Sequence, residues 1–198
     1  MQISPAKSAT LHVLHDVKFS YVIFGETIPE CKQVRDLGLT LSADLKPDSH
    51  VCDVISRAGR TANFIVRAFD CKLPVVYLQA YRALVLSVLM YASPAWRPWT
   101  KKSLDMLEAF QKRFIRRVAF KCDVDPCDIQ LEPINDLLDQ RDIGLARQIL
   151  GNPDFADFFV IRTTRTRSRV MYVVPLATHN TVFNSFRWRL SRRLSCDM

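Results

Sequence analysis

The hydrophobic pattern of the chain centres on residues 77–98, its most apolar stretch. No charged residue lies between Arg82 and Arg97, and two prolines close the run. A helix that is apolar nearly all round belongs in the centre of a core. The uncharged part is shorter than the roughly 20 residues that a helix needs to cross a bilayer. We therefore expect a buried helix from Pro74 to about Tyr91 and no transmembrane segment.

Two amphipathic segments flank this central helix. Apolar side chains recur every three or four positions over residues 51–69, which predicts a helix. It should start near His50, with Ser49 as its N-cap, and end near Asp70. The same spacing, followed by basic residues on the opposite side, predicts a second amphipathic helix over residues 101–121.

The N-terminal segment has the pattern of short strands. Apolar runs at residues 10–14 and 19–24 predict strands, and Gly25 is placed for a tight turn, so we expect a hairpin. Residues 33–41 predict a further strand. Gly38 inside that strand indicates a bulge or the close approach of another backbone.

After residue 121 the chain is first acidic and then basic. A helix is expected over residues 139–150. Farther on, Arg165, Arg167 and Arg169 occupy alternate positions. In a strand these three side chains would share one face, whereas in a loop they would form a flexible basic arm. Later arginines alternate with aromatic residues, a composition that suits single strands and backbone phosphate.

Together these patterns predict an α+β fold. A short β-hairpin region at the N-terminus should precede a mainly helical bundle and an irregular basic C-terminal region. Hydrophobic residues make up 48% of the 198 residues and charged residues 24%, which excludes disorder throughout the chain.

The net charge of +8 favours an acidic partner, nucleic acid first and an anionic membrane surface second. Simple solubility would explain the same net charge. The clustering of cations in the helix at 101–121 favours phosphate binding over a merely solvated basic face. Those cations are Lys101, Lys102, Lys112, Arg113, Arg116, Arg117 and Lys121.

Familiar catalytic and metal-binding motifs do not occur in the sequence. The five glycines form no phosphate-binding loop, and the four histidines are scattered. Cys122 and Cys127 lack a second pair at zinc-finger spacing. No secretory signal precedes the six cysteines, so we interpret them as reduced thiols of an intracellular protein. No small-molecule substrate and no metal site is predicted.

A series of short motifs runs through nearly the whole chain. They are QVRDLGL at 33–39, DLK at 44–46, YRALV at 81–85, LMYASPAW at 89–96, LE at 107–108, QKRF at 111–114, TRSR at 166–169 and VPL at 174–176. Their order and spacing resemble the C-terminal part of the reverse transcriptase of non-LTR, LINE-type retrotransposons, with the jockey-like elements most similar. The sequence departs from that pattern at Met90, where the family usually has glutamate, and over residues 120–130.

The resemblance implies a fragment of an RNA-directed DNA polymerase. Residues 1–41 would be a remnant of the β-rich palm, residues 42–121 a thumb-like helical domain, and residues 122–198 a post-thumb region. The family holds its Mg²⁺ ions on palm aspartates that include an Asp-Asp pair, and this sequence contains no such pair. We therefore expect the chain alone to be inactive and to need no cofactor. Lys7 matches the palm lysine by resemblance only.

The resemblance also implies RNA and DNA, as a template–primer duplex, for partners. Leu37 and Gly38 match the hairpin that grips the primer end. The residues expected to contact nucleic acid are Leu37, Gly38, Lys101, Lys102, Lys112, Arg113, Arg116, Arg117, Arg165, Arg167 and Arg169. Two alternatives stay open: a non-enzymatic basic module that binds RNA or DNA, and a protein whose amphipathic helix at 101–121 binds membranes or protein partners.

Overall fold

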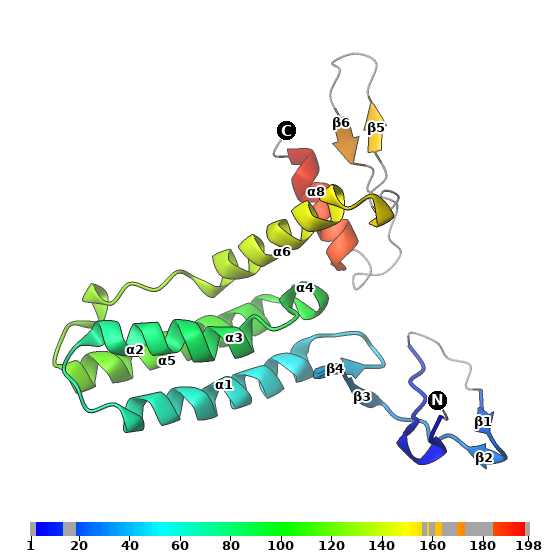
Figure 1. Cartoon of the computed structure of the whole chain (residues 1–198), viewed down its shortest axis with the longest axis horizontal. Helices are drawn as coiled ribbons and strands as arrows, with labels where there is room; N and C mark the ends of the chain where they lie inside the picture. Colours follow the sequence, from blue (N-terminus) through cyan, green and yellow to red (C-terminus); the bar gives the residue numbers. More distant parts are fainter. Residues whose placement is uncertain are drawn as a thin grey trace.

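The computed structural model describes residues 3–13, 19–155, 158, 161–163, 170–172 and 184–196. Its architecture is mixed α+β, as predicted: two small antiparallel hairpins near the N-terminus precede a mostly helical region (Figure 1). A third hairpin and a last helix follow in the C-terminal part.

The first hairpin confirms the turn predicted at Gly25. Strands β1 (Val22–Ile23) and β2 (Glu26–Thr27) are antiparallel, with Ile23 opposite Glu26. Phe24 and Gly25 form the turn with φ angles of +50° and +82°. Positive φ at both central residues is the requirement of the type I′ turn, whose twist matches that of the paired strands.

The second hairpin corrects the single strand predicted over residues 33–41. Strands β3 (Gln33–Asp36) and β4 (Leu39–Ser42) pair antiparallel, with Asp36 opposite Leu39. Leu37 and Gly38 form the turn between them, at φ angles of +46° and +85°. Gly38 is therefore the second residue of a two-residue turn. The bulge interpretation was wrong because Gly38 lies in the turn between two paired strands and not inside one strand.

Helices α1 (Asp48–Ala68) and α5 (Lys101–Cys122) confirm the two amphipathic helices and run in the same direction. Near their first turns, the Thr100 hydroxyl lies 3.4 Å from Asp48 Oδ1. Near their last turns, Lys121 Nζ donates to the carbonyl of Val66 at 2.8 Å. Because α1 already begins at Asp48, Ser49 lies in its first turn, and the prediction of Ser49 as N-cap was wrong.

The central helix comprises α2 (Pro74–Ala80), a π-helical turn at Tyr81–Val85 labelled η2, and α3 (Leu86–Leu89). Its inward side chains are Tyr77, Tyr81, Val85 and Leu89, all 0% exposed. They recur every four residues, so in a regular helix with 3.6 residues per turn they would drift around the axis. The wider π turn corrects this drift and keeps all four on one face.

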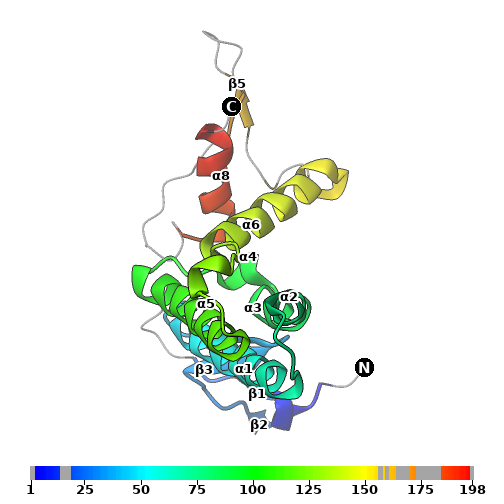
Figure 2. The same ribbon diagram turned by 90° about the vertical axis from the view of Figure 1, so that its left-hand side faces the viewer.

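The central helix is less enclosed than its composition predicts. Val75 and Leu84 are about half exposed, at 53% and 48%. The helix therefore buries one face against α1 and α5 rather than its whole circumference (Figure 2). Inside the bundle, the Tyr81 ring stacks on Phe114 at a centroid distance of 4.5 Å. The Tyr81 hydroxyl donates to Gln111 Oε1 at 3.1 Å, which satisfies both buried polar groups.

The short helix α4 (Ser93–Trp96) lies between α3 and α5. The C-terminal part adds helices α6 (Ile134–Gly151) and α8 (Phe186–Cys196), and the hairpin of β5 (Ile161–Thr163) and β6 (Val170–Tyr172). Helix α6 starts five residues earlier than the predicted range of 139–150. The reason is that Ile134 and Leu138 are buried against the bundle and extend its apolar face. Helix α8 was not predicted from the sequence.

Candidate nucleic-acid interface

A basic groove runs between α1 and α5. Three adjoining surface pockets form it. The pocket beside Arg35 shares Ser56 and Arg60 with the middle pocket. The middle pocket shares Arg113 and Arg117 with the pocket beside Phe120. The middle pocket has a volume of about 290 Å³. We call this feature the α1–α5 basic groove. Its arginines are Arg35 from β3, Arg57 and Arg60 from α1, and Arg113, Arg116 and Arg117 from α5.

The charge of the groove is almost uniformly positive. Among the residues that line its three pockets, Asp53 is the only acidic one, and its Oδ2 accepts from the Thr40 hydroxyl at 2.7 Å. Within the described part of the chain, no groove arginine forms an ion pair with an acidic side chain. Parallel helices with cations on adjoining sides therefore leave the positive potential of the groove available to an anionic ligand.

Two polar contacts shape the floor and the far end of the groove. Arg117 donates to the side-chain oxygen of Asn63 and so links α5 to α1 across the groove. Lys121 donates to the carbonyls of Val66 and Phe69, the last carbonyls of α1. A lysine at this position compensates the negative end of the helix dipole. Lys121 therefore stabilises α1 and is not counted among the groove cations.

The other predicted cations of α5 are exposed but lie outside the groove lining. Lys112 precedes the groove residue Arg116 by four positions, but it lines none of the three pockets. Lys101 and Lys102 are in the first turn, and eleven residues separate Lys102 from Arg113, which is about 16 Å along a helix axis. The seven cations predicted on this segment thus divide into Lys101 and Lys102 at the start of α5, Lys112, the three groove arginines of α5, and Lys121, which contacts the end of α1.

The predicted primer-grip residues lie at a hairpin tip that docks onto the bundle. The Tyr91 hydroxyl donates to the carbonyl of Leu37 at 3.1 Å, while the Leu37 side chain is 82% exposed. A Cβ atom on Gly38 would lie 3.4 Å from the Tyr91 ring. Arg35, in the same hairpin, lines the groove, whereas Leu37 and Gly38 do not.

Two further predictions are not brought to the groove. Lys7 is exposed in a short 3-10 helix, Pro5–Lys7, and lines none of the three pockets. Arg165, Arg167 and Arg169 lie outside the described residues, so the strand and the loop alternatives for them stay open.

The arginines that β3 and α1 contribute to the groove were not predicted from the sequence. Arg57 and Arg60 do fall off the apolar stripe of α1, and that signal marks them as surface residues. What the pattern does not contain is the relative direction of α1 and α5. Because α1 packs against α5, exposed side chains of both helices line the same groove.

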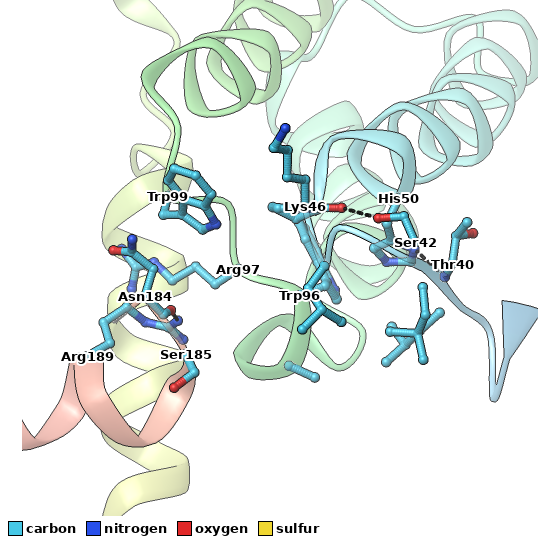
Figure 3. Close-up of a pocket in the computed structure, with 15 residues that line it drawn as sticks. Thr40, Ser42, Lys46, His50, Trp96, Arg97, Trp99, Asn184, Ser185 and Arg189 are labelled. Atoms are coloured by element: carbon cyan, nitrogen blue, oxygen red, sulfur yellow. Dashed lines mark hydrogen bonds between the residues drawn. The ribbon is translucent and has the colours of Figure 1, made fainter. Parts of the chain in front are cut away.

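A separate, smaller cavity of about 190 Å³ lies between β4, the start of α1 and the α4 segment (Figure 3). His50 is buried in its wall, at 1% exposure, with its ring 5.1 Å from that of Trp96. Its Nδ1 accepts from the Thr40 backbone N–H at 3.1 Å, so the neutral ring carries its proton on Nε2. Burial, together with the positive charge of Arg57, lowers the pKa of His50 to about 4.

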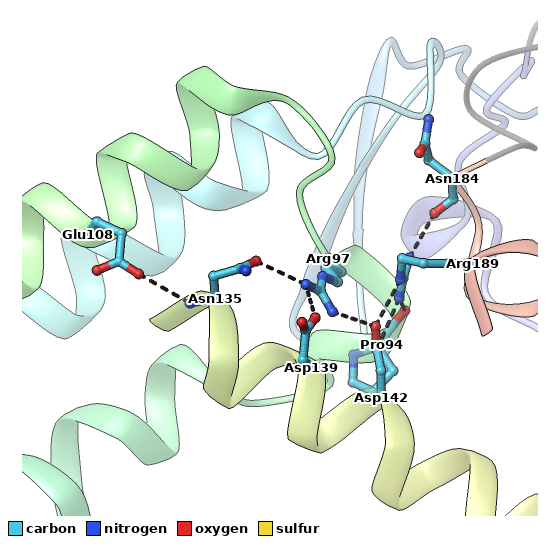
Figure 4. Close-up of polar contacts among 8 residues, drawn as sticks. All are labelled: Pro94, Arg97, Glu108, Asn135, Asp139, Asp142, Asn184 and Arg189. Carbon is cyan, nitrogen blue, oxygen red and sulfur yellow. Dashed lines mark hydrogen bonds and ion pairs between the residues drawn. The ribbon is translucent and has the colours of Figure 1, made fainter. Parts of the chain in front are cut away.

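A buried ion network joins α6 and α8 to the segment after α4 (Figure 4). Arg97 Nη1 donates to Asp142 Oδ2 at 2.8 Å. Arg189 donates to both oxygens of the same carboxylate, at 2.8 and 3.0 Å. Asp142 is 0% exposed, and Arg97 also contacts Asp139. Arg189, one of the arginines expected to suit single strands, is therefore a structural partner of Asp142.

The described part of the chain contains no cluster of three or more His, Cys, Asp or Glu side chains that could hold a metal ion. Every helix in the same part is too short or too polar to span a bilayer. Five of the six cysteines are free thiols: Cys31, Cys52, Cys71, Cys122 and Cys127. No protein-family model, no curated protein and no solved structure matches the chain.

Proposed function

We propose that this chain is the end of the palm, the thumb and the post-thumb region of a LINE-type RNA-directed DNA polymerase, and that its α1–α5 basic groove binds template–primer nucleic acid. The observation that carries the proposal is the line of arginines from β3, α1 and α5 along one groove. The sequence motifs that resemble the family supply the polymerase assignment.

Arginine suits this role because its planar guanidinium donates bidentate hydrogen bonds to phosphate. Each phosphate contact with duplex releases counterions and steepens the dependence of log affinity on log salt by about 0.9. If the groove arginines contact phosphates individually, the slope for the whole groove is roughly −5. Such binding would depend little on base sequence, because backbone contacts position a protein without reading bases.

We also propose that the chain alone does not polymerise DNA. Two-metal phosphoryl transfer needs carboxylates that hold both ions, and the sequence has no Asp-Asp pair. A lysine such as Lys7 could stabilise a phosphate but could not replace those ligands. Primer extension on an RNA template, with the purified chain and Mg²⁺ or Mn²⁺, should give no product.

The alternative of a non-enzymatic RNA- or DNA-binding module relies on the same groove, and it makes the same binding prediction. The alternative of a membrane-binding amphipathic helix is less well supported. The apolar stripe of α5 lies in the core, with Leu107, Phe114 and Val118 exposed by 2% or less. Lipid contact by that stripe would require the bundle to open, whereas the arginines already face outward.

Charge reversal tests the binding proposal. We expect Arg113→Glu combined with Arg117→Glu to lower affinity for an RNA–DNA duplex at least tenfold and to reduce the salt slope by about 2. Fluorescence anisotropy between 50 and 200 mM salt measures both quantities. Arg147→Glu, applied to an exposed arginine of α6 outside the groove, is the matched control. The proposal would be refuted if duplex affinity did not depend on salt. It would also be refuted if Arg147→Glu lowered duplex affinity as much, per reversed charge, as the double variant.

A further inference from the structure

The two helices that form the α1–α5 basic groove each carry an exposed phenylalanine. Phe120 of α5 is 91% exposed and Phe64 of α1 is 67% exposed. Phe64 follows Arg60 by four residues, so the two side chains are neighbours on the surface of α1. Phe120 lines the pocket at the far end of the groove, which has a volume of about 520 Å³.

What distinguishes Phe120 from other exposed apolar residues is its cationic surroundings. Single exposed apolar side chains are common and need no explanation by themselves. Phe120, however, lines its pocket together with Arg113, Arg116 and Arg117. Spacings of three, four and seven residues put these four side chains on one side of α5. The pocket thus combines an accessible aromatic face with three guanidinium groups.

This combination matches the chemistry of an unpaired nucleotide. Aromatic side chains stack on the faces of exposed bases, and adjacent cations hold the backbone phosphates. In a duplex the bases are stacked on one another and their faces are not available. A site that contacts only the phosphates of a duplex would not involve the ring of Phe120, which is 91% exposed.

We propose that the Phe120 end of the groove binds a single-stranded segment of nucleic acid, with a base stacked on Phe120 and the flanking phosphates held by Arg113, Arg116 and Arg117. The inference rests on the proposed function of the groove in binding nucleic acid, and it specifies unpaired nucleotides as the ligand at the Phe120 end. A strand would pass from duplex, held along the arginines between α1 and α5, to unpaired nucleotides at Phe120. The stacked base contributes between about fivefold and a hundredfold to affinity.

The test compares Phe120→Ala and Phe120→Trp with the wild-type chain. Anisotropy is measured with a labelled single-stranded oligonucleotide, the same strand with abasic sites, and a blunt duplex of equal length. Phe120→Ala should lower affinity for the intact single strand at least fivefold and leave duplex affinity within twofold. Phe120→Trp should retain the wild-type affinity. The abasic strand should bind wild type as weakly as the intact strand binds Phe120→Ala.

Phe24→Ala is the matched control, because Phe24 is 79% exposed in the β1–β2 turn and lines none of the groove pockets. Equal binding of intact and abasic strands by wild type would overturn the stacking inference. So would equal losses of single-strand and duplex affinity in Phe120→Ala. In both cases salt-dependent duplex binding would leave the groove proposal standing. Absence of binding to all three ligands would overturn both proposals.

Discussion

The free energy of unfolding should depend on pH through His50. This histidine is buried in the wall of the smaller cavity, where its Nδ1 accepts from the Thr40 backbone N–H. Burial disfavours the charged imidazolium, and Arg57 and Arg35 add repulsion that Asp53 only partly offsets. The pKa of His50 is therefore about 4 in the folded chain, against an ordinary value of 6.5.

The sign and size of the effect follow from linkage. A depressed histidine pKa means that the unfolded chain binds the proton first as pH falls. The stabilisation is thus fully present above pH 6.5 and is lost as pH falls from there toward 4. At 1.36 kcal/mol for each unit of pKa, the folded state loses about 3 kcal/mol between pH 7 and pH 4.

Urea denaturation followed by far-ultraviolet circular dichroism at pH 7, 6, 5 and 4 measures this loss. The comparison is with His50→Asn, because the asparagine oxygen can accept the Thr40 N–H without titrating. Carboxylates that protonate in the same range affect both chains alike and cancel in the difference. The wild-type chain should therefore lose about 3 kcal/mol more than the variant over this range. Parallel pH profiles for the two chains would refute the assignment of a neutral, buried His50.

Two further changes test the ion network and the second hairpin. Asp142→Asn leaves Arg97 and Arg189 buried without their shared counter-charge, so it should lower the unfolding free energy by about 3–5 kcal/mol and make α8 the first site of limited proteolysis. A destabilisation under about 1 kcal/mol would contradict the network's role. Gly38→Ala places an alanine at a φ of +85° and should cost about 1 kcal/mol of unfolding free energy. Gly144→Ala, in the regular geometry of α6 with open space around it, should be neutral or stabilising. Thermal melts of both variants and the wild-type chain measure these effects.

Much of the helical part could be predicted from the sequence because apolar spacing reports directly on burial. The stripe over residues 51–69 and the stripe of α5 both indicate the face that the bundle covers. The apolar pattern does not predict the hairpin at residues 33–42, although the family resemblance implied a hairpin at Leu37 and Gly38. Leu37, Leu39 and Leu41 alternate across the turn and so predict one continuous strand, whereas the two-residue turn at Leu37 and Gly38 places Val34 opposite Leu41.

Only part of the candidate site could be predicted from the sequence. The arginines of α5 were predicted because they cluster in one segment, on the polar side of a helix with a clear apolar stripe. Arg35, Arg57 and Arg60 were not assigned because their relevance depends on which helix sides adjoin. For Arg189 the prediction failed in the opposite sense. Its sequence context indicates a surface cation, but it forms a buried ion pair with Asp142 of α6, 47 positions earlier in the chain.

The parallel arrangement of α1 and α5 also bears on how the chain folds. In an up-and-down bundle, helices that pack together are antiparallel and are joined by short loops, so their contacts are close in sequence. Here the Asp48–Thr100 and Val66–Lys121 contacts join residues 52 and 55 positions apart, and the central helix must cross back between them. Contacts of such sequence separation require a long loop to close before they contribute. This bundle therefore has a higher contact order than its helical content suggests, and its assembly rate is set by topology rather than by helix formation.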